Sequence, residues 1–209
     1  MVLRIDYYLS LNSPWTHLGA ARVEALAARH GAELCPFPVD FRDVVFPASG
    51  GLPLPKRSPQ RQRYRMQELR RWRDRLGAPI VLGPRFSPYD EAAAARAVIA
   101  ARETVDNAAA VRLAHRVLRA LWEEERDPAD PRTLAELIRE CGLDPTALSE
   151  LAADSRWNEQ RERDSRAALA RGVFGAPSYV VGDAVFWGQD RLDFLDEHLA
   201  RGGDGPPGR

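Results

Sequence analysis

The chain has 209 residues, enough for one hydrophobic core or for one domain that carries a large insertion. Thirty Lys and Arg residues balance thirty Asp and Glu residues, and this formal net charge of zero argues against a nucleic-acid partner. No apolar run approaches the roughly eighteen residues that cross a bilayer and the N-terminus lacks a signal-peptide pattern, so we expect a cytoplasmic protein with no membrane partner.

The first forty residues predict a β-α-β unit. Leu3–Leu11 is rich in Ile, Leu and Tyr, as in a buried strand, and Pro14–Arg29 has apolar residues at the spacing of one helical face. Ser13 stands at the N-cap position of this helix, and Pro14 takes its favoured first position. Glu33–Val39 predicts a second strand, whose two prolines favour the edge of a sheet.

A helical segment follows. Residues 46–59 are dense in Gly, Pro and Ser, which predicts a loop, and residues 60–172 are helical almost throughout. Gly77, Gly142 and Gly172 mark helix ends, and Asp144-Pro145 marks a helix start. We expect helices at about residues 60–76, 87–103, 106–126 and 133–141, a short one from 145, and one at 155–171.

The pattern returns to strands after Gly172. Residues 178–181 and 185–187 predict two strands joined at Gly182-Asp183, a hairpin signal, and residues 190–199 predict a final helix. The order β-α-β, helices, β-β-α has the elements of a thioredoxin-like fold interrupted by a large all-helical insertion. An α/β domain of another topology beside a separate helical domain is the alternative.

The thioredoxin-like interpretation divides the chain as follows. Residues 1–45 and 173–201 form a discontinuous thioredoxin-like domain, and residues 60–172 form the helical insertion domain. Residues 46–59 are the loop between them, and the Gly- and Pro-rich residues 202–209 are a disordered tail.

Ser13 lies where the first strand meets the first helix. The free N–H groups and the dipole of a helix N-terminus favour an anion there, and a serine adds a hydroxyl donor. Redox proteins of the thioredoxin type carry Cys-x-x-Cys at this place, whereas this chain reads Ser13-Pro14-Trp15-Thr16. Disulfide exchange by this motif is therefore impossible, and the site suits a thiolate brought by a cofactor. A plain helix cap is the alternative.

Two further stretches carry candidate chemistry. X-Pro bonds can be cis, and a cis Ala176-Pro177 bond would expose the backbone of Ala176 for pairing with an extended ligand. An ordinary trans proline at a strand start is the alternative. Gln189 and Asp190 fall at the start of the final helix, where Asp190 can act as its cap.

The sequence gives little support for a metal site or for a redox-active cysteine pair. Cys35 and Cys141 are far apart and form no Cys-x-x-Cys pair, and the four histidines are scattered. We therefore expect two free thiols and no metal site.

Three motifs in order carry a family resemblance. They are DYYLSLNSPWTHLG from Asp6, QRYRMQELRRWRDRLG from Gln62, and GVFGAPSYVVGDAVFWGQDRLDFL from Gly172. Together they resemble the 2-hydroxychromene-2-carboxylate isomerases and the kappa-class glutathione transferases, which belong to the DsbA-like branch of the thioredoxin superfamily. The resemblance extends over about residues 3–200.

The resemblance implies a function and a cofactor. The expected activity is a glutathione-dependent isomerisation of 2-hydroxychromene-2-carboxylate-like aromatic catabolites, small molecules, through transient addition of the glutathione thiolate. A kappa-like glutathione transferase with another electrophile, or a non-catalytic DsbA-like peptide-binding relative, is the alternative. Family members commonly form homodimers, a property that this sequence does not itself indicate.

The resemblance also implies site residues. Ser13 matches the serine that activates the glutathione sulfur, and Ala176, before the cis Pro177, matches the residue whose backbone pairs with the cysteinyl part. Gln189 and Asp190 match the γ-glutamyl contacts. Arg61 stands where a lysine often approaches the glycine carboxylate, and arginine can bind that group in a bidentate way.

Some residues fit this pattern less well. Many isomerases carry Asn-Ser where this chain has Asp90-Glu91, and two acids that lined a substrate pocket would repel a carboxylate substrate. His17, one turn after Ser13, could transfer protons, although a partly buried structural histidine is the simpler interpretation. Trp187 could form a pocket wall, but a core position in its strand is the simpler expectation.

Overall fold

The computed structural model describes residues 3–202, and of the predicted disordered tail 202–209 only Gly202 lies within this range. Four strands form one mixed sheet in the order β2-β1-β3-β4. Parallel β1–β2 pairing and antiparallel β1–β3 and β3–β4 pairing complete the topology. The strands are β1 (Arg4–Leu9), β2 (Glu33–Pro38), β3 (Ser178–Val181) and β4 (Ala184–Trp187).

This topology confirms the predicted thioredoxin-like fold with a helical insertion. β2, with its two prolines, lies at an edge of the sheet, as predicted. A proline lacks the N–H that a central strand needs for pairing on both sides. The helix α1 (Pro14–Arg29) joins β1 to the parallel β2, and α9 (Leu192–Ala200) follows the β3–β4 hairpin.

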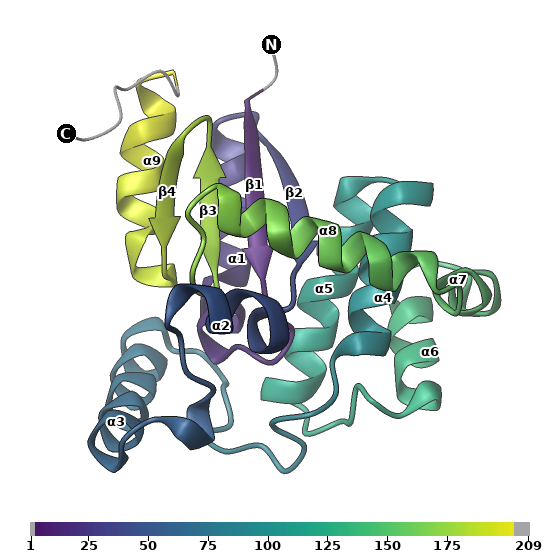
Figure 1. Ribbon diagram of the computed structural model, residues 1–209, viewed down its shortest axis with the longest axis horizontal. Coiled ribbons are helices and arrows are strands. Elements are labelled where there is room, and N and C mark those ends of the chain that lie inside the picture. The colour runs from purple at the N-terminus through teal and green to yellow at the C-terminus, as the bar shows by residue number, and fades with distance from the viewer. Residues whose placement is uncertain (1–2, 203–209) are drawn as a thin grey trace.

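The sheet buries different side chains on its two faces. Ile5, Tyr7 and Leu9 of β1 belong to the larger hydrophobic cluster, which also includes residues of α1 and α9. Tyr8 belongs to a second cluster that includes Val173 and Ala168. Successive strand residues point to opposite faces, so β1 is buried on both faces of the sheet. It lies between β2 and β3. Figure 1 shows α8 crossing one face of the sheet, in front of β1 and β3.

The insertion is helical, as predicted. Ser58 and Gly77 cap α3, Asp106 caps α5, and Gly172 follows α8 in the left-handed conformation. Gly77 and Gly172 were predicted as helix ends, and Ser58 and Asp106 are N-cap residue types. The helices are α3 (Pro59–Leu76), α4 (Ala92–Thr104), α5 (Asn107–Trp122), α6 (Pro131–Glu140), α7 (Pro145–Ala152) and α8 (Arg156–Ala170).

Two helix predictions are wrong. The second insertion helix begins at Ala92 instead of Ser87, because the Tyr89 backbone is hydrogen-bonded to the Asn12 side chain and stays outside the helix. The final helix begins at Leu192, after a 3-10 turn at Gln189–Arg191, and no side chain of the described residues caps it. Asp190 therefore does not cap it as predicted.

The stretch 46–59 is not a continuous loop. A turn of π-helix (Phe41–Val45) runs directly into α2 (Phe46–Ser49), and a 3-10 turn follows at Leu54–Lys56. Asp40 caps the first turn by accepting a hydrogen bond from Asp43 N–H at 2.9 Å. An aspartate three residues before an N–H is a local helix-start signal that was missed in the sequence.

One hydrophobic cluster joins the two predicted domains. It contains Tyr179 of β3 and Leu26 of α1 together with Val98, Leu118 and Ile138 of the insertion helices. The division into two domains stays a prediction. Within residues 3–202, no helix combines the length and the apolar character that crossing a membrane requires.

Candidate functional site

Ser13 occupies the corner where β1 gives way to α1. Its backbone is extended (φ −88°, ψ 118°), and its Oγ accepts a hydrogen bond from Thr16 N–H at 3.2 Å, as predicted for an N-cap. The side chain is only half-buried. Among residues 3–202 no acceptor binds the Ser13 hydroxyl hydrogen, so this O–H is free to donate to a ligand.

The Ala176–Pro177 peptide bond is cis, as the resemblance implied. Tyr8 pairs with Ser178, so the residues before β3 continue alongside the end of β1, next to the Ser13 corner. The Pro177 C=O accepts a hydrogen bond from Gly188 N–H at 2.8 Å. In the described part of the chain, neither backbone polar group of Ala176 forms a hydrogen bond, so both are available to an extended ligand.

An exposed aromatic pair stands beside the cis bond. The rings of Phe174 and Trp187 lie 4.7 Å apart between centroids, and the two side chains are 43% and 51% exposed. A Cβ at Gly175 would overlap the Trp187 indole nitrogen, so a larger residue there would have to displace the Trp187 ring. The expectation that Trp187 is a core residue is therefore wrong, because β4 is an edge strand and its last residue points outward.

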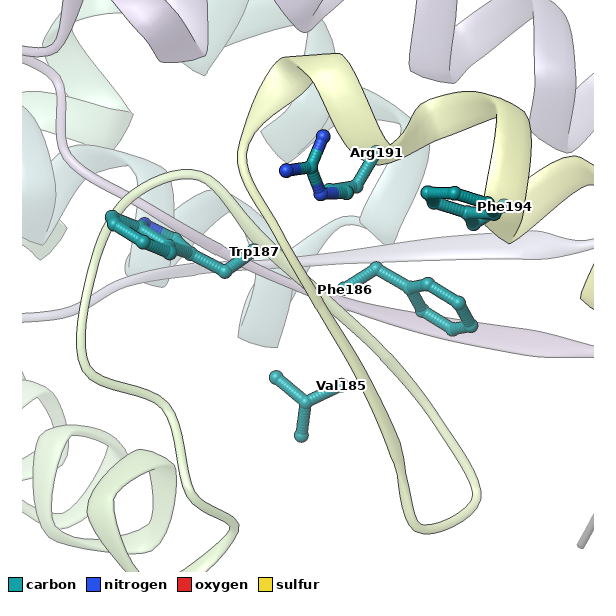
Figure 2. A pocket seen from close by; sticks show the side chains of 5 residues that line it. All are labelled: Val185, Phe186, Trp187, Arg191 and Phe194. Carbon is teal, nitrogen blue, oxygen red and sulfur yellow. The ribbon is translucent and has the colours of Figure 1, made fainter. Parts of the chain in front are cut away.

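Trp187 also borders a shallow pocket of about 330 Å³. Figure 2 shows its ring on one side of β4, with Phe186 and Phe194 on the other side and Arg191 above the strand. The lining residues are Val185, Phe186, Trp187, Arg191 and Phe194.

Gln189 is buried and packs closely against α1. It is 2% exposed, and Arg22 Nη1 donates to its side-chain oxygen at 2.5 Å and to its backbone C=O at 3.0 Å. A Cβ at Gly19 would lie 3.0 Å from Gln189 Cβ, which shows how closely α1 approaches. Asp190 is exposed and accepts a hydrogen bond from Arg191 at 2.9 Å. The Asp190 carboxylate is thus accessible, whereas the Gln189 oxygen is occupied.

Arg61 is exposed on α3, with Arg57 just before this helix and Arg65 about one turn further along it. Burial and the neighbouring Arg61 lower the pKa of Arg57, and burial and Arg57 lower the pKa of Arg65 to about 10. Arg57 Nε donates to the Leu52 C=O at 2.7 Å, and Arg65 contacts the Met66 sulfur at 3.8 Å. Three neighbouring cations without a carboxylate partner among residues 3–202 favour binding of an anion.

The two acids Asp90 and Glu91 lie in different environments. Glu91 forms an ion pair with Arg161 at 2.8 Å and accepts hydrogen bonds from Ser10 and Asn12. Its charge is therefore balanced. Asp90 is exposed and accepts a hydrogen bond from Ala92 N–H at 3.0 Å, at the start of α4.

His17 points away from this corner. Its Nε2 lies 3.2 Å from a carboxylate oxygen of Glu123, and burial lowers the pKa of His17 to about 4. It is therefore neutral at pH 7, which agrees with the structural interpretation. His17 borders a groove of about 580 Å³ between α1 and α5 that does not include Ser13.

Among residues 3–202, no cluster of three or more His, Cys, Asp or Glu side chains is arranged to bind a metal, and both cysteines are free.

Comparisons with known proteins agree with this geometry. The family described as DSBA-like thioredoxin domain matches residues 4–200. A 2-hydroxychromene-2-carboxylate isomerase of Sphingobium xenophagum is 30% identical over 199 residues, covering 95% of this chain and 99% of that protein.

Two solved structures share the fold. A 2-hydroxychromene-2-carboxylate isomerase has a TM-score of 0.80 at 24% identity and covers 95% of both chains. The cytosolic disulfide reductase DsbM of Pseudomonas aeruginosa with GSH has a TM-score of 0.64 at 20% identity, covering 96% of this chain and 98% of that one.

Proposed function

Because the chain belongs to the family of DSBA-like thioredoxin domains, we propose that it is an isomerase that acts on aromatic acids of the 2-hydroxychromene-2-carboxylate class and uses glutathione as thiol cofactor. Its relative from Sphingobium xenophagum is named for that isomerisation. A related fold was solved with GSH. When bound, glutathione supplies the thiolate nucleophile that residues 13–16 of this chain lack.

The free hydroxyl of Ser13 is the observation that carries this proposal. Its Oγ accepts a hydrogen bond from Thr16 N–H, and its hydrogen is still available to donate, which suits an anion. The start of α1 adds the favourable end of the helix dipole. A hydrogen bond to a charged sulfur and a nearby helix N-terminus both favour the thiolate over the thiol.

The other predicted contact residues offer groups for the rest of a tripeptide. The free N–H and C=O of Ala176, fixed in place by the cis bond to Pro177, would pair with the cysteinyl backbone. The accessible carboxylate of Asp190 suits an ammonium group. Gln189, in contrast, is 2% exposed and held by Arg22, so its amide is not accessible to a ligand. Arg61 would bind the glycine carboxylate through its guanidinium.

Two features suit an aromatic acid as substrate. Phe174 and Trp187 present exposed rings beside the cis bond, and a flat aromatic ring gains from stacking on such a surface. Arg57 and Arg65 supply further cations near Arg61, so the α3 surface can bind more than one carboxylate.

Calorimetric titration with glutathione tests the cofactor part of the proposal. We expect saturable binding that weakens strongly in Ser13→Ala and is unchanged in Ser149→Ala, a matched change at an exposed helical serine. Equal binding by Ser13→Ala and the unaltered protein would contradict the role of Ser13.

A spectrophotometric assay with a 2-hydroxychromene-2-carboxylate tests the reaction. Turnover that requires glutathione supports the isomerase. Conjugation of another electrophile, without isomerisation, would instead support a glutathione transferase. Because the Ala176 backbone is free, peptide binding is the second candidate function, and saturable peptide affinity without thiol affinity would favour it.

A further inference from the structure

The β1–α1 corner, residues 10–13, is hydrogen-bonded to residues 89–91, which are far away in the sequence. The Asn12 side chain donates from Nδ2 to the Tyr89 C=O at 2.9 Å and accepts from Tyr89 N–H at 3.0 Å. These paired hydrogen bonds join the end of β1 to the residues just before α4. The corner therefore depends on a tertiary contact for its shape.

Glu91 accepts three hydrogen bonds from residues of this corner. One of its carboxylate oxygens, Oε2, accepts from Ser10 Oγ at 2.9 Å, from Asn12 N–H at 3.0 Å and from Asn12 Nδ2 at 3.3 Å. The corner is a tight turn, in which Ser13 N–H donates to the Ser10 C=O at 3.1 Å. Among residues 3–202 that turn gives Asn12 N–H no backbone partner, and its acceptors are Glu91 Oε2 at 3.0 Å and Ser10 Oγ at 3.2 Å.

The other carboxylate oxygen of Glu91 faces Arg161. Arg161 Nη2 donates to Glu91 Oε1 at 2.8 Å, and Arg161 Nε donates to the Pro38 C=O at the end of β2 at 3.1 Å. The two side chains are only 15% and 11% exposed. Arg161 also lies 3.7 Å from a carboxylate oxygen of Asp40, but its shorter contact is with Glu91. The charge of Glu91 is therefore compensated where Glu91 holds the corner.

We propose that Glu91, acting through Asn12, is a positioning residue that fixes the β1–α1 corner so that the Ser13 hydroxyl faces a bound thiol. This inference rests on the proposed function. Glu91 does not touch the thiol itself, because its oxygens are occupied by Ser10, Asn12 and Arg161. Its effect on the thiol therefore passes through the position of Ser13.

Hydrogen–deuterium exchange of the ligand-free protein tests whether Glu91 holds the corner. We compare Glu91→Ala and the conservative Glu91→Gln with Asp90→Asn, a matched change at the exposed neighbouring acid. The buried amides of β1 serve as an internal reference for global unfolding. We expect the Asn12 amide to exchange about tenfold faster or more in Glu91→Ala, since one charge-assisted hydrogen bond is lost. Glu91→Gln should be intermediate and Asp90→Asn unchanged.

A pair of ligands tests whether this position matters for a thiol. Glutathione offers an ionisable sulfur to Ser13, whereas S-methylglutathione does not. We expect Glu91→Ala to weaken glutathione binding about tenfold and to leave S-methylglutathione binding nearly unchanged. Equal weakening of both ligands, or unchanged exchange at Asn12, would overturn the proposal. If the unaltered protein binds neither ligand, the proposed function fails, and the exchange experiment still decides whether Glu91 holds the corner.

Discussion

Replacing Arg161 by glutamine is expected to destabilise the protein strongly. Arg161 is the charged partner of Glu91, and the two side chains are 11% and 15% exposed. Removing one member of a buried ion pair leaves the other charge uncompensated and costs about 3–5 kcal/mol. Arg163→Gln on the same helix is the control. Its partner Glu159 lies 3.7 Å away and both are well exposed, so its loss should cost under about 1 kcal/mol.

The destabilisation by Arg161→Gln should depend on pH. Burial raises the pKa of Glu91, and Arg161 opposes that shift. Without Arg161 the pKa of Glu91 in the folded state rises further above its unfolded value of about 4.3. The Glu91 carboxyl then loses its proton at a lower pH in the unfolded chain than in the folded variant. The free energy of unfolding of the variant therefore falls as the pH rises. The loss of unfolding free energy caused by Arg161→Gln should be small near pH 4. It should reach its full size once the pH exceeds the pKa of Glu91 in the folded variant.

Urea unfolding at pH 4.5 and pH 7 measures both effects. We expect the double variant Glu91→Gln/Arg161→Gln to be more stable than Arg161→Gln alone at pH 7, because no buried charge is left unpaired. An additive loss in the double variant, or an Arg161→Gln loss equal to that of Arg163→Gln, would refute the reasoning.

Three further predictions concern other parts of the molecule. Gly19→Ala should cost about 1–3 kcal/mol by overpacking, since its Cβ would lie 2.8 Å from the Tyr179 hydroxyl. Tyr179→Phe should recover part of that loss in thermal melts and be near neutral alone, because this buried hydroxyl has no hydrogen-bond partner within residues 3–202; no recovery would argue against the overlap. The imidazole of His17, whose pKa burial lowers to about 4, should show no protonation by NMR at pH 6, and a midpoint near 6.5 would contradict its burial. Arg61→Gln should weaken glutathione but not its glycine ethyl ester, whereas Arg63→Gln, an exposed neighbour, should weaken neither; equal losses for ester and acid would exclude Arg61 as the carboxylate contact.

Much of the fold could be predicted because its signals are local. The Ser13-Pro14 start of α1 and the left-handed Gly77 and Gly172 at helix ends depend on backbone chemistry within a few residues. The prolines of β2 likewise indicated an edge strand, which the sheet order confirms. The cis Ala176–Pro177 bond was implied by the family motif, since local chemistry alone allows either isomer.

The contacts that shape the Ser13 corner could not be predicted. Asn12, Tyr89 and Glu91 meet across a long stretch of chain, and no periodicity marks such a meeting. The same contacts keep Tyr89 out of α4, which explains why the predicted helix start at Ser87 is wrong. The exposure of Trp187 was missed for a related reason, because strand order decides which strand lies at the edge.

The ultraviolet absorbance of bound glutathione near 240 nm tests most directly whether Ser13 holds a thiolate. A cysteine thiol has an ordinary pKa of about 8.5, so free glutathione is mostly protonated at pH 7. We expect thiolate absorbance to appear at pH 7 when glutathione binds the unaltered protein, and to shift to higher pH by about one unit or more in Ser13→Ala. Binding without thiolate absorbance, or the same titration in Ser13→Ala, would contradict the claim.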